Sequence, residues 1–522
     1  MKLNNKRTIL VGFAFFLICA FWQIYDVTIA MTLTSKFGLS QTVSGMVMAL
    51  DNILALFMLP LFGGISDRCK SKSGRRTPFI RTGTILAVVF LMLLSFADNA
   101  QLKNIERYSK VNDPATMEMI YDEQKDATLQ TPEGVQYKLA DLYTREEFAQ
   151  LTTDSKTTEL NRFGREVEVN LYTRYVVPAR QACAAAVTAE NPATVVIFLG
   201  ILLLLLISMA TFRTPAVALM PDVTLKPLRS KANAIINLMG NAGGIIVLGI
   251  GSVLAISKVK NAYMSYTGVY AIVAGIMLVA LVIFLLTVKE PAWVAEMQKQ
   301  SIALGLDKAE EPVETGEKKK LSKAELRSLI FLLASIVLWF FGYNAITSKY
   351  TVYAQNVLDK DATTTLLLAN VAAIVSYLPV GMVASKIGRK KTILAGVAML
   401  FTAFFAGCFL SASSPNWLMT AMFILAGVAW ATINVNSFPM VVEMCSGADV
   451  GKYTGFYYTA SMAAQSLTPT VSGIFMDRVA MTTLFPYASI FVALAFFTML
   501  MVKHGDSKAE VKKGLEALDI DD

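Results

Sequence analysis

Gly63-Gly64-Ile65-Ser66-Asp67-Arg68, followed by Gly74-Arg75-Arg76, stands directly after an apolar run of the chain. A related stretch, Gly381-Met382-Val383-Ala384-Ser385-Lys386 followed by Gly388-Arg389-Lys390-Lys391, stands after another apolar run far downstream. Two further runs also end alike, one in Leu219-Met220-Pro221-Asp222 and the other in Phe438-Pro439-Met440-Val441-Val442-Glu443. Because corresponding positions recur in the same order, the sequence predicts two related halves.

The composition places most side chains outside water. Of the 522 residues, 55% are hydrophobic and only 16% are charged, whereas an average soluble domain has about 25% charged residues. Apolar runs of about 20 residues recur, each long enough to cross a hydrocarbon core of about 30 Å. We expect spans near 8–33, 44–65, 79–97, 193–220, 231–255, 265–288, 327–353, 363–384, 391–411, 416–438, 451–476 and 483–503. The predicted fold is an all-α membrane protein, with about twelve transmembrane helices in two six-helix pseudo-symmetric halves.

Lysines and arginines are concentrated on one side of this arrangement. They occur at the N-terminus and in the segments 68–81, 226–231 and 386–391, whereas the alternate short loops carry few. Basic loops stay on the cytoplasmic side, so we expect a multi-pass protein of the cell membrane with both termini cytoplasmic. The predicted domains are an N-terminal half (1–98 and 193–288), an external insertion between helices 3 and 4 (99–192), a cytoplasmic linker (289–325), a C-terminal half (326–503) and a cytoplasmic tail (504–522).

The first repeated stretch also carries a family resemblance. Ser66-Asp67-Arg68-Cys69, with the later Gly74-Arg75-Arg76-Thr77-Pro78-Phe79-Ile80, resembles the loop between helices two and three of the major facilitator superfamily. The Pro-Phe-Ile ending, with Pro60 ahead of the motif, is similar to the sucrose-carrier branch of the glycoside–pentoside–hexuronide:cation symporters. The superfamily resemblance covers 1–98 and 193–503, and it implies a carrier with alternating access. The insertion has no counterpart in it.

Ionisable side chains inside the predicted spans are the candidates for coupling to a cation. Each costs at least about 2.5–3.5 kcal/mol on insertion scales and so needs a reason to be there. Asp26 shares a helix face with Trp22 in the first span, and Asp51 lies in the outer part of the second. The sucrose-carrier branch has an arginine where this chain has Val217, but Arg213 lies four residues earlier on the same helical face. We predict cation coupling by Asp26, Asp51 and Arg213; the alternative is a fixed ion pair that packs the N-terminal half.

Amides and aromatic rings in the spans are the candidates for binding a substrate. Asn233, Asn237 and Asn241 form one polar stripe at helical spacing, although we place Asn233 too near the cytoplasm to touch a substrate. Rings and amides with few charges favour a neutral polyhydroxylated ligand; the alternative is that they pack helices together or sit at the membrane interface. The predicted substrate-binding residues are Trp22, Tyr25, Asn241, Tyr343, Asn344, Trp430, Asn434 and Gln465.

Charged residues near the repeated loops are predicted to form a gate. A carboxylate at one helix end can meet the positive N-terminus of another helix, and the family resemblance implies that such a cluster holds the cytoplasmic face closed in one state. The alternative is that the basic loops serve only orientation and lipid contact. The predicted gate residues are Gly64, Asp67, Arg68, Gly74, Arg75, Arg76, Asp222, Arg389 and Glu443.

Three functional hypotheses remain after these observations. The first is a monomeric secondary active symporter, coupled to a proton or sodium, that imports a sugar or glycoside. The second is an exporter of hydrophobic or cationic small molecules, which the 25 Met and 30 Phe keep open. The third is a non-transporting sensor on the same scaffold. The sequence has no Walker motif, no catalytic constellation and no metal-ligand cysteine spacing. We therefore expect no enzymatic activity, ATP-driven transport, cofactor, metal or nucleic-acid partner.

Overall fold

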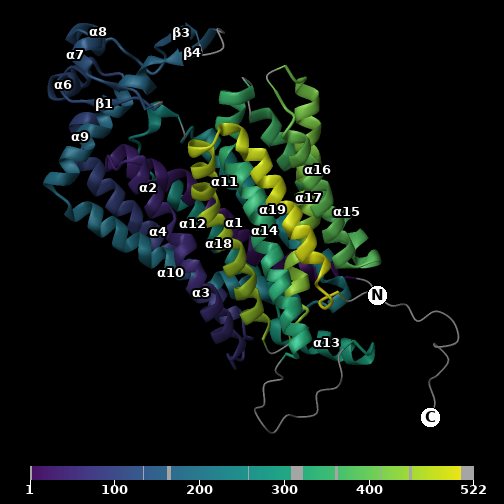
Figure 1. Cartoon of the computed structure of the whole chain (residues 1–522). Coiled ribbons are helices and arrows are strands. Elements are labelled where there is room, and N and C mark those ends of the chain that lie inside the picture. The colour runs from purple at the N-terminus through teal and green to yellow at the C-terminus, as the bar shows by residue number, and fades with distance from the viewer. Residues whose placement is uncertain are drawn as a thin grey trace, which may run out of the picture.

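The fold is a bundle of long helices with a small mixed domain at one end (Figure 1). The computed structural model describes residues 3–132, 134–160, 166–256, 258–306, 321–358, 363–411, 413–445 and 449–506. Within these ranges, eleven helical segments are long and apolar enough to cross a membrane. Helix α18 (Val450–Arg478) is a twelfth of 29 residues, or about 44 Å at 1.5 Å per residue, although many of its residues are Thr, Ser, Tyr and Gly. The predicted all-α fold of about twelve membrane helices is confirmed.

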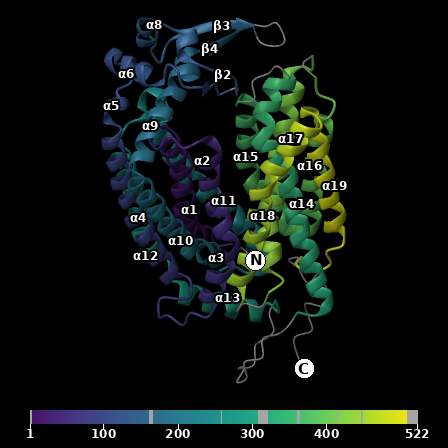
Figure 2. The same ribbon diagram turned by 60° about the vertical axis from the view of Figure 1, so that its left-hand side comes forward.

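Six long helical segments come from each half of the chain. The first six are α1 (Asn5–Met31) with its π-helical end η1 (Thr32–Lys36), α2 (Gln41–Met48) continued by α3 (Leu50–Asp67), α4 (Thr77–Asn104), α10 (Ala193–Asp222), α11 (Arg229–Val253) and α12 (Thr267–Thr287). The second six are α14 (Lys323–Tyr353) with η5 (Ala354–Leu358), α15 (Thr363–Ile387), α16 (Arg389–Gly407), α17 (Asn416–Val442), α18 and α19 (Leu484–Leu500). We call these groups the N half and the C half; they form two bundles side by side (Figure 2).

The two halves meet mainly through two helix pairs. Helix α3 packs against α18, and α11 packs against α15. These pairs join the second helix of each half to the fifth helix of the other, as expected for two related halves. We call the end that carries loop 68–76 the basic end, and the opposite end the insertion end.

The insertion forms a compact domain of its own at the end of the N half (Figure 2). Its helices are α5 (Glu106–Ser109), α6 (Pro114–Gln124), α7 (Leu139–Leu142), α8 (Arg145–Ala149), η2 (Tyr172–Val176) and α9 (Val177–Glu190). Its strands form two antiparallel hairpins, β1 (Leu129–Gln130) with β2 (Gln136–Tyr137) and β3 (Lys156–Leu160) with β4 (Glu166–Asn170). A separate apolar core, which includes Met117, Phe148 and Tyr172, also packs on Tyr263 in the N half. The N half therefore carries the insertion.

The linker begins with a helix at the basic end. Helix α13 (Glu290–Ala303) packs on the N half through Arg7, whose guanidinium pairs with Glu296 at 2.7 Å and lies over the Trp293 ring. Linker residues 307–320 and tail residues 507–522 lie outside the described residues, so the predicted 289–325 linker and 504–522 tail are described only in part.

A buried ion pair joins three elements of the N half near the insertion. The Nζ of Lys36 donates to both oxygens of Asp98, at 2.8 and 2.7 Å, and to the Met264 carbonyl at 2.8 Å. Both charged side chains are fully buried, and the ammonium lies 3.9 Å from the centre of the Tyr266 ring. The pair thus joins η1, α4 and the loop between α11 and α12.

Replacing Lys36 by Met is expected to lower the free energy of unfolding by about 3–5 kcal/mol, because Asp98 stays buried without its partner. The double variant Lys36→Met/Asp98→Leu should recover most of that loss. The matched control is Arg145→Ala, which breaks exposed ion pairs of the insertion with Glu118 and Asp122 and should have no measurable effect. Thermal and denaturant-induced unfolding in detergent measures the free energy of unfolding of all three variants. Equal losses for Lys36→Met and Arg145→Ala would contradict this account.

Candidate functional site

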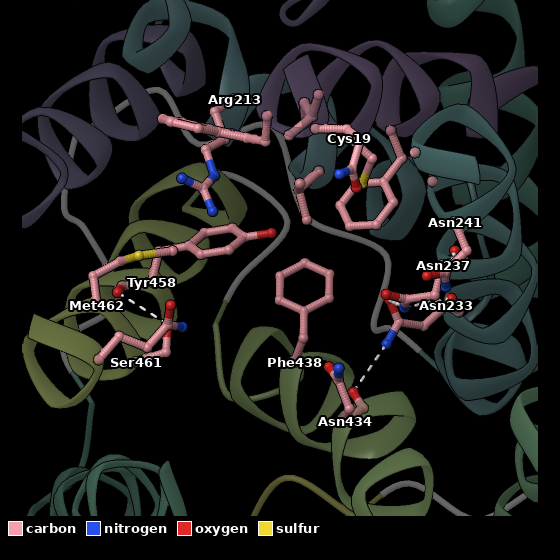
Figure 3. Close-up of a pocket in the computed structure, with 18 of the residues that line it drawn as sticks. Cys19, Arg213, Asn233, Asn237, Asn241, Asn434, Phe438, Tyr458, Ser461 and Met462 are labelled. Carbon is pink, nitrogen blue, oxygen red and sulfur yellow. Dashed lines mark hydrogen bonds between the residues drawn. The ribbon is translucent and has the colours of Figure 1, made fainter. Parts of the chain in front are cut away.

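A cavity of about 480 Å³ lies between the two halves. Its volume falls in the range of about 300–1,000 Å³ that is typical of small-molecule sites. The lining comes from α1, α10 and α11 of the N half and from α14, α17 and α18 of the C half (Figure 3). Seven predicted site residues line it: Trp22, Asp26, Arg213, Asn241, Trp430, Asn434 and Gln465. The structure thus brings residues from both halves to one space.

Arg213 extends from α10 into the cavity between two aromatic rings (Figure 3). Its guanidinium carbon lies 5.3 Å from the centre of the Trp22 ring and 5.1 Å from that of Tyr458. Attraction to the ring faces stabilises a cation without using its N–H donors. Among the described residues, the guanidinium makes no ion pair or hydrogen bond, so its donors remain available to a ligand.

The two predicted coupling carboxylates lie on different sides of Trp22. Asp26 lines the cavity itself. Asp51 instead lines a side pocket of about 10 Å³, together with Trp22 and Arg213. Its Oδ1 is buried and has no hydrogen-bond partner among the described residues. Arg213 thus lines both spaces and connects them electrostatically, although neither carboxylate forms a direct ion pair with it.

Three predicted binding residues lie outside the cavity lining. Tyr343 stacks flat behind Trp430, with ring centres 3.7 Å apart and planes 4° apart. Tyr25 is buried behind Trp22, with its ring centre 5.1 Å from the indole. Asn344 follows Tyr343 on α14, and its Nδ2 is buried with no partner among the described residues. Tyr25 and Tyr343 thus lie behind the aromatic rings of the lining rather than in it.

The amide stripe of α11 is a hydrogen-bonded ladder along one wall of the cavity. Asn241 donates to the Asn237 carbonyl at 2.9 Å, and Asn237 donates to the Asn233 carbonyl at 2.8 Å. Asn233 lines the cavity as well, whereas we expected it to lie too near the cytoplasm to touch a substrate. Each of the three amides donates an N–H to a backbone carbonyl, and all three residues line the cavity.

Sequence reasoning missed most of the wall formed by α18. Tyr457, Tyr458, Ser461 and Met462 line the cavity in addition to Gln465. The spacing from Tyr457 to Ser461 and Gln465 is i, i+4 and i+8, which identifies one helix face. That periodicity, extended back from Gln465, was the signal that could have found them. Gln23 on α1 and Phe438 on α17 also belong to the lining.

At the basic end, α3 meets the N-terminus of α18. Asp67 accepts hydrogen bonds from the backbone N–H groups of Gly451 at 2.8 Å and Lys452 at 2.9 Å. A carboxylate there satisfies free amides and opposes the positive end of the helix dipole. The backbones approach so closely that a Cβ on Gly63 would lie 2.2 Å from the Gly451 carbonyl oxygen. Gly63 is therefore a glycine that this contact requires.

Arg76 joins this contact to the rest of the N half. Its fully buried guanidinium donates to Asp67 at 2.5 Å and to Asp222 at 2.8 Å, and Arg75 pairs with Asp222 at 3.2 Å. The Glu290 carboxylate accepts from the backbone N–H groups of Arg76 and Thr77 at 2.9 and 2.8 Å, and so caps α4. Gly74 turns the chain beside that carboxylate with φ +107°.

The corresponding cluster of the C half also reaches the N half, through an arginine instead of a carboxylate. Arg389 forms an ion pair with Glu443, donates to the Ser230 hydroxyl at 2.9 Å and reaches the Lys226 carbonyl. Of the predicted gate residues, Gly64 and Arg68 lie apart from these contacts. A Cβ on Gly64 would meet nothing within 4 Å, and Arg68 forms no ion pair among the described residues. The basic end is closed by charged side chains from both halves.

Nothing in the described residues gathers three His, Cys, Asp or Glu side chains in a geometry suited to a metal ion. The polar groups of the cavity are instead one guanidinium, one carboxylate, amides and hydroxyls. Such groups can bind a small polar molecule from several sides.

The fold resembles those of several solved membrane transporters. The E. coli fucose:proton symporter FucP, in a variant structure, matches with a TM-score of 0.57 at 10% identity, covering 95% of this chain and 98% of that one. A double tryptophan mutant of XylE matches with a TM-score of 0.63 at 12% identity, covering 98% of both. A bacterial homologue of the iron transporter ferroportin in its outward-facing state matches with a TM-score of 0.60 at 11% identity, covering 96% and 99%. At these identities the likeness shows the fold alone.

The family model of the Major Facilitator Superfamily matches residues 11–104, 179–376 and 361–518. Together these segments cover most of the chain and leave out much of the insertion. The matched residues include parts of both six-helix halves. The chain belongs to the major facilitator superfamily and is a membrane transporter.

Proposed function

We propose that this transporter is a symporter that couples a proton or another cation to uptake of a sugar or glycoside by alternating access. The observation that carries the proposal is the cavity between the halves. Its lining combines an aromatic plate, a ladder of amides and the pair Asp26 and Arg213. Rings suit the apolar faces of a sugar, and amides suit its hydroxyls. The distant likeness to the sugar symporters FucP and XylE is in keeping with this proposal.

Trp430 is the plate on which a sugar ring would stack. Tyr343 covers one face of its indole, and Phe340 meets it edge-on with ring centres 5.0 Å apart. Because these contacts hold the indole in place, a substrate would pay little for ordering it. An exporter of organic cations fits less well, since a guanidinium that would repel such a ligand extends into the cavity.

Asp26 is the proposed site for the coupling cation. It faces the cavity, whereas Asp51 lies in the side pocket with an unpartnered oxygen. A carboxylate whose partner changes between the two states of the cycle can take up a proton in one state and release it in the other. Arg213, which lines both spaces, is the proposed partner that makes this difference.

The orientation that we propose puts the basic end in the cytoplasm. Loops 68–81, 226–231 and 386–391 then lie on the positive side of the membrane. The insertion lies outside the cell, and both termini lie inside. In this orientation the closed basic end corresponds to a state that is closed on the cytoplasmic side.

Cells or vesicles that contain the protein should accumulate a subset of labelled mono- and disaccharides and glycosides, and an agent that collapses the proton gradient should abolish the accumulation. Replacing the proton gradient with a sodium gradient separates the two candidate cations. Exclusion of every sugar, with energy-dependent efflux of lipophilic cations instead, would contradict the proposal and support an exporter.

Asp26→Asn is expected to abolish accumulation against a gradient while leaving exchange of substrate across the membrane, because the amide cannot carry the proton. A driving force of about 59 mV per charge corresponds to about tenfold accumulation, which this variant should lose. Asp51→Asn is expected to reduce accumulation as well. Asp141→Asn, an exposed carboxylate of the insertion, is the matched control and should transport normally. Full accumulation by both Asp26→Asn and Asp51→Asn would rule out this assignment.

Gly451→Ala is expected to open the basic end. A methyl group there would lie 2.4 Å from the Gly63 carbonyl oxygen, whereas Gly473 on the same helix has its nearest neighbour 3.5 Å away. Alanine normally stabilises a helix relative to glycine by about 1 kcal/mol. A loss of stability of the closed basic end in Gly451→Ala must therefore come from the clash between the two helices. Cys19, which lines the cavity, reports opening by its rate of reaction with a charged thiol reagent from the basic side. Gly473→Ala is the control, and an equal rate for both would count against the gate.

A further inference from the structure

A proline in α17 leaves one backbone carbonyl without its helical partner. In an α-helix each carbonyl accepts from the N–H four residues later, but Pro439 has no N–H to offer to Val435. Val435 is completely buried. A buried carbonyl without a partner is costly, so another donor must reach it.

That donor comes from the other half of the molecule. The Nδ2 of Asn233 on α11 donates to the Val435 carbonyl at 2.9 Å. It also donates to the Asn434 carbonyl at 3.3 Å (Figure 3). Asn233 is 3% exposed, and both Asn233 and Asn434 line the cavity. The bond therefore crosses from one half to the other at the boundary of the cavity.

An apolar layer excludes water around this bond. Ala234 from the N half packs in one cluster with Ala373, Tyr377 and Ala431 from the C half, together with Val435 itself. Beside it, Gly381 of α15 allows close approach, since a Cβ there would lie 3.2 Å from the Lys231 Cα. A hydrogen bond in such a low-dielectric layer is stronger than one in water.

Asn237 determines which way the Asn233 amide faces. It lies one turn further along α11, lines the cavity and donates to the Asn233 Oδ1 at 3.2 Å. With the Oδ1 held on that side, the Nδ2 faces α17. A flipped amide would set its oxygen against the Val435 carbonyl, which offers only lone pairs.

We infer that Asn233 is an inner latch of the basic end, with Asn237 as its positioning residue. The latch is a separate layer from the charged clusters of Asp67 and Arg389, and it lies next to the cavity. Opening the basic end requires that the Asn233 amide leave the Val435 carbonyl. The inference holds for any substrate or coupling ion, so failure of the sugar hypothesis would not affect it.

The test measures the rate at which a charged thiol reagent labels Cys19 from each side of sealed vesicles, with the other four cysteines replaced by Ala. Asn233→Ala should raise the rate from the basic side about tenfold and lower it from the insertion side. Asn237→Asp should act in the same direction, because a carboxylate attracts the Asn233 N–H groups away from α17. The matched control is Asn436→Ala, which removes an equally buried amide that donates within its own helix to Thr432 at 2.8 Å. It should change the rate by less than about twofold.

A second measurement guards against simple misfolding. A misfolded variant would label equally from both sides and lose its cooperative thermal transition in detergent. In the background Pro439→Ala, where residue 439 can again donate to Val435, Asn233→Ala should cost less stability than it does in the native chain. Folded Asn233→Ala protein that labels at the native rate would overturn the inference, as would an equal increase for Asn436→Ala.

Discussion

Asp67 lies at the N-terminus of α18, and the closed basic end is organised around that contact. A carboxylate from one half satisfies backbone amides of the other, which is possible only because Gly63 and Gly451 let the two helices nearly touch. Arg76 then compensates the buried charge and transmits the contact to Asp222 on α10. The C half crosses by a different contact, in which Arg389 pairs with Glu443 and donates to the Ser230 hydroxyl of the N half. In each cluster the buried charges are paired within one half, and hydrogen bonds to the other half then join the two halves at the basic end.

The lining of the cavity obeys the same constraint, which is that polar groups in an apolar medium need partners. Each amide of the α11 ladder gives an N–H to a backbone carbonyl, so the stripe can lie inside the membrane without a ligand. Arg213 is also stabilised without a ligand, because it lies between the Trp22 and Tyr458 rings and its donors remain unused. The site is thus stable when empty and still presents donors to a ligand. That combination is what a carrier needs, since it must exist unloaded in part of its cycle.

Much of this arrangement could be predicted from the sequence, because membrane helices and half-repeats leave long-range patterns. The spans and the two halves needed only hydropathy and repetition, whereas the cluster of Asp67, Arg76 and Asp222 was what the family resemblance implied. It was harder to predict which side chains on a helix face lie nearest to the cavity. The sequence predicts that Tyr343 and Trp430 both contact a ligand, yet Tyr343 lies behind Trp430. Helical spacing identifies the face of a helix, but it does not say which of two rings lies nearer the cavity. The predicted gate includes Gly64, whereas Gly63 contacts Gly451. The two residues lie about 100° apart around the helix. Contacts across the halves, such as Asn233 with Val435, depend on a register between distant segments that no local pattern contains.

The insertion removes a difficulty that two similar halves create. Two bundles of six helices look nearly alike when one is turned onto the other, and a detergent belt hides most of what distinguishes them. The insertion is a folded domain with its own core, and it contacts the end of the N half at residues such as Tyr263. It breaks that pseudo-twofold symmetry outside the belt. It marks which bundle is which and which end is which in projection images. It also offers a rigid epitope for an antibody fragment, at a distance from the cavity and from the closed basic end.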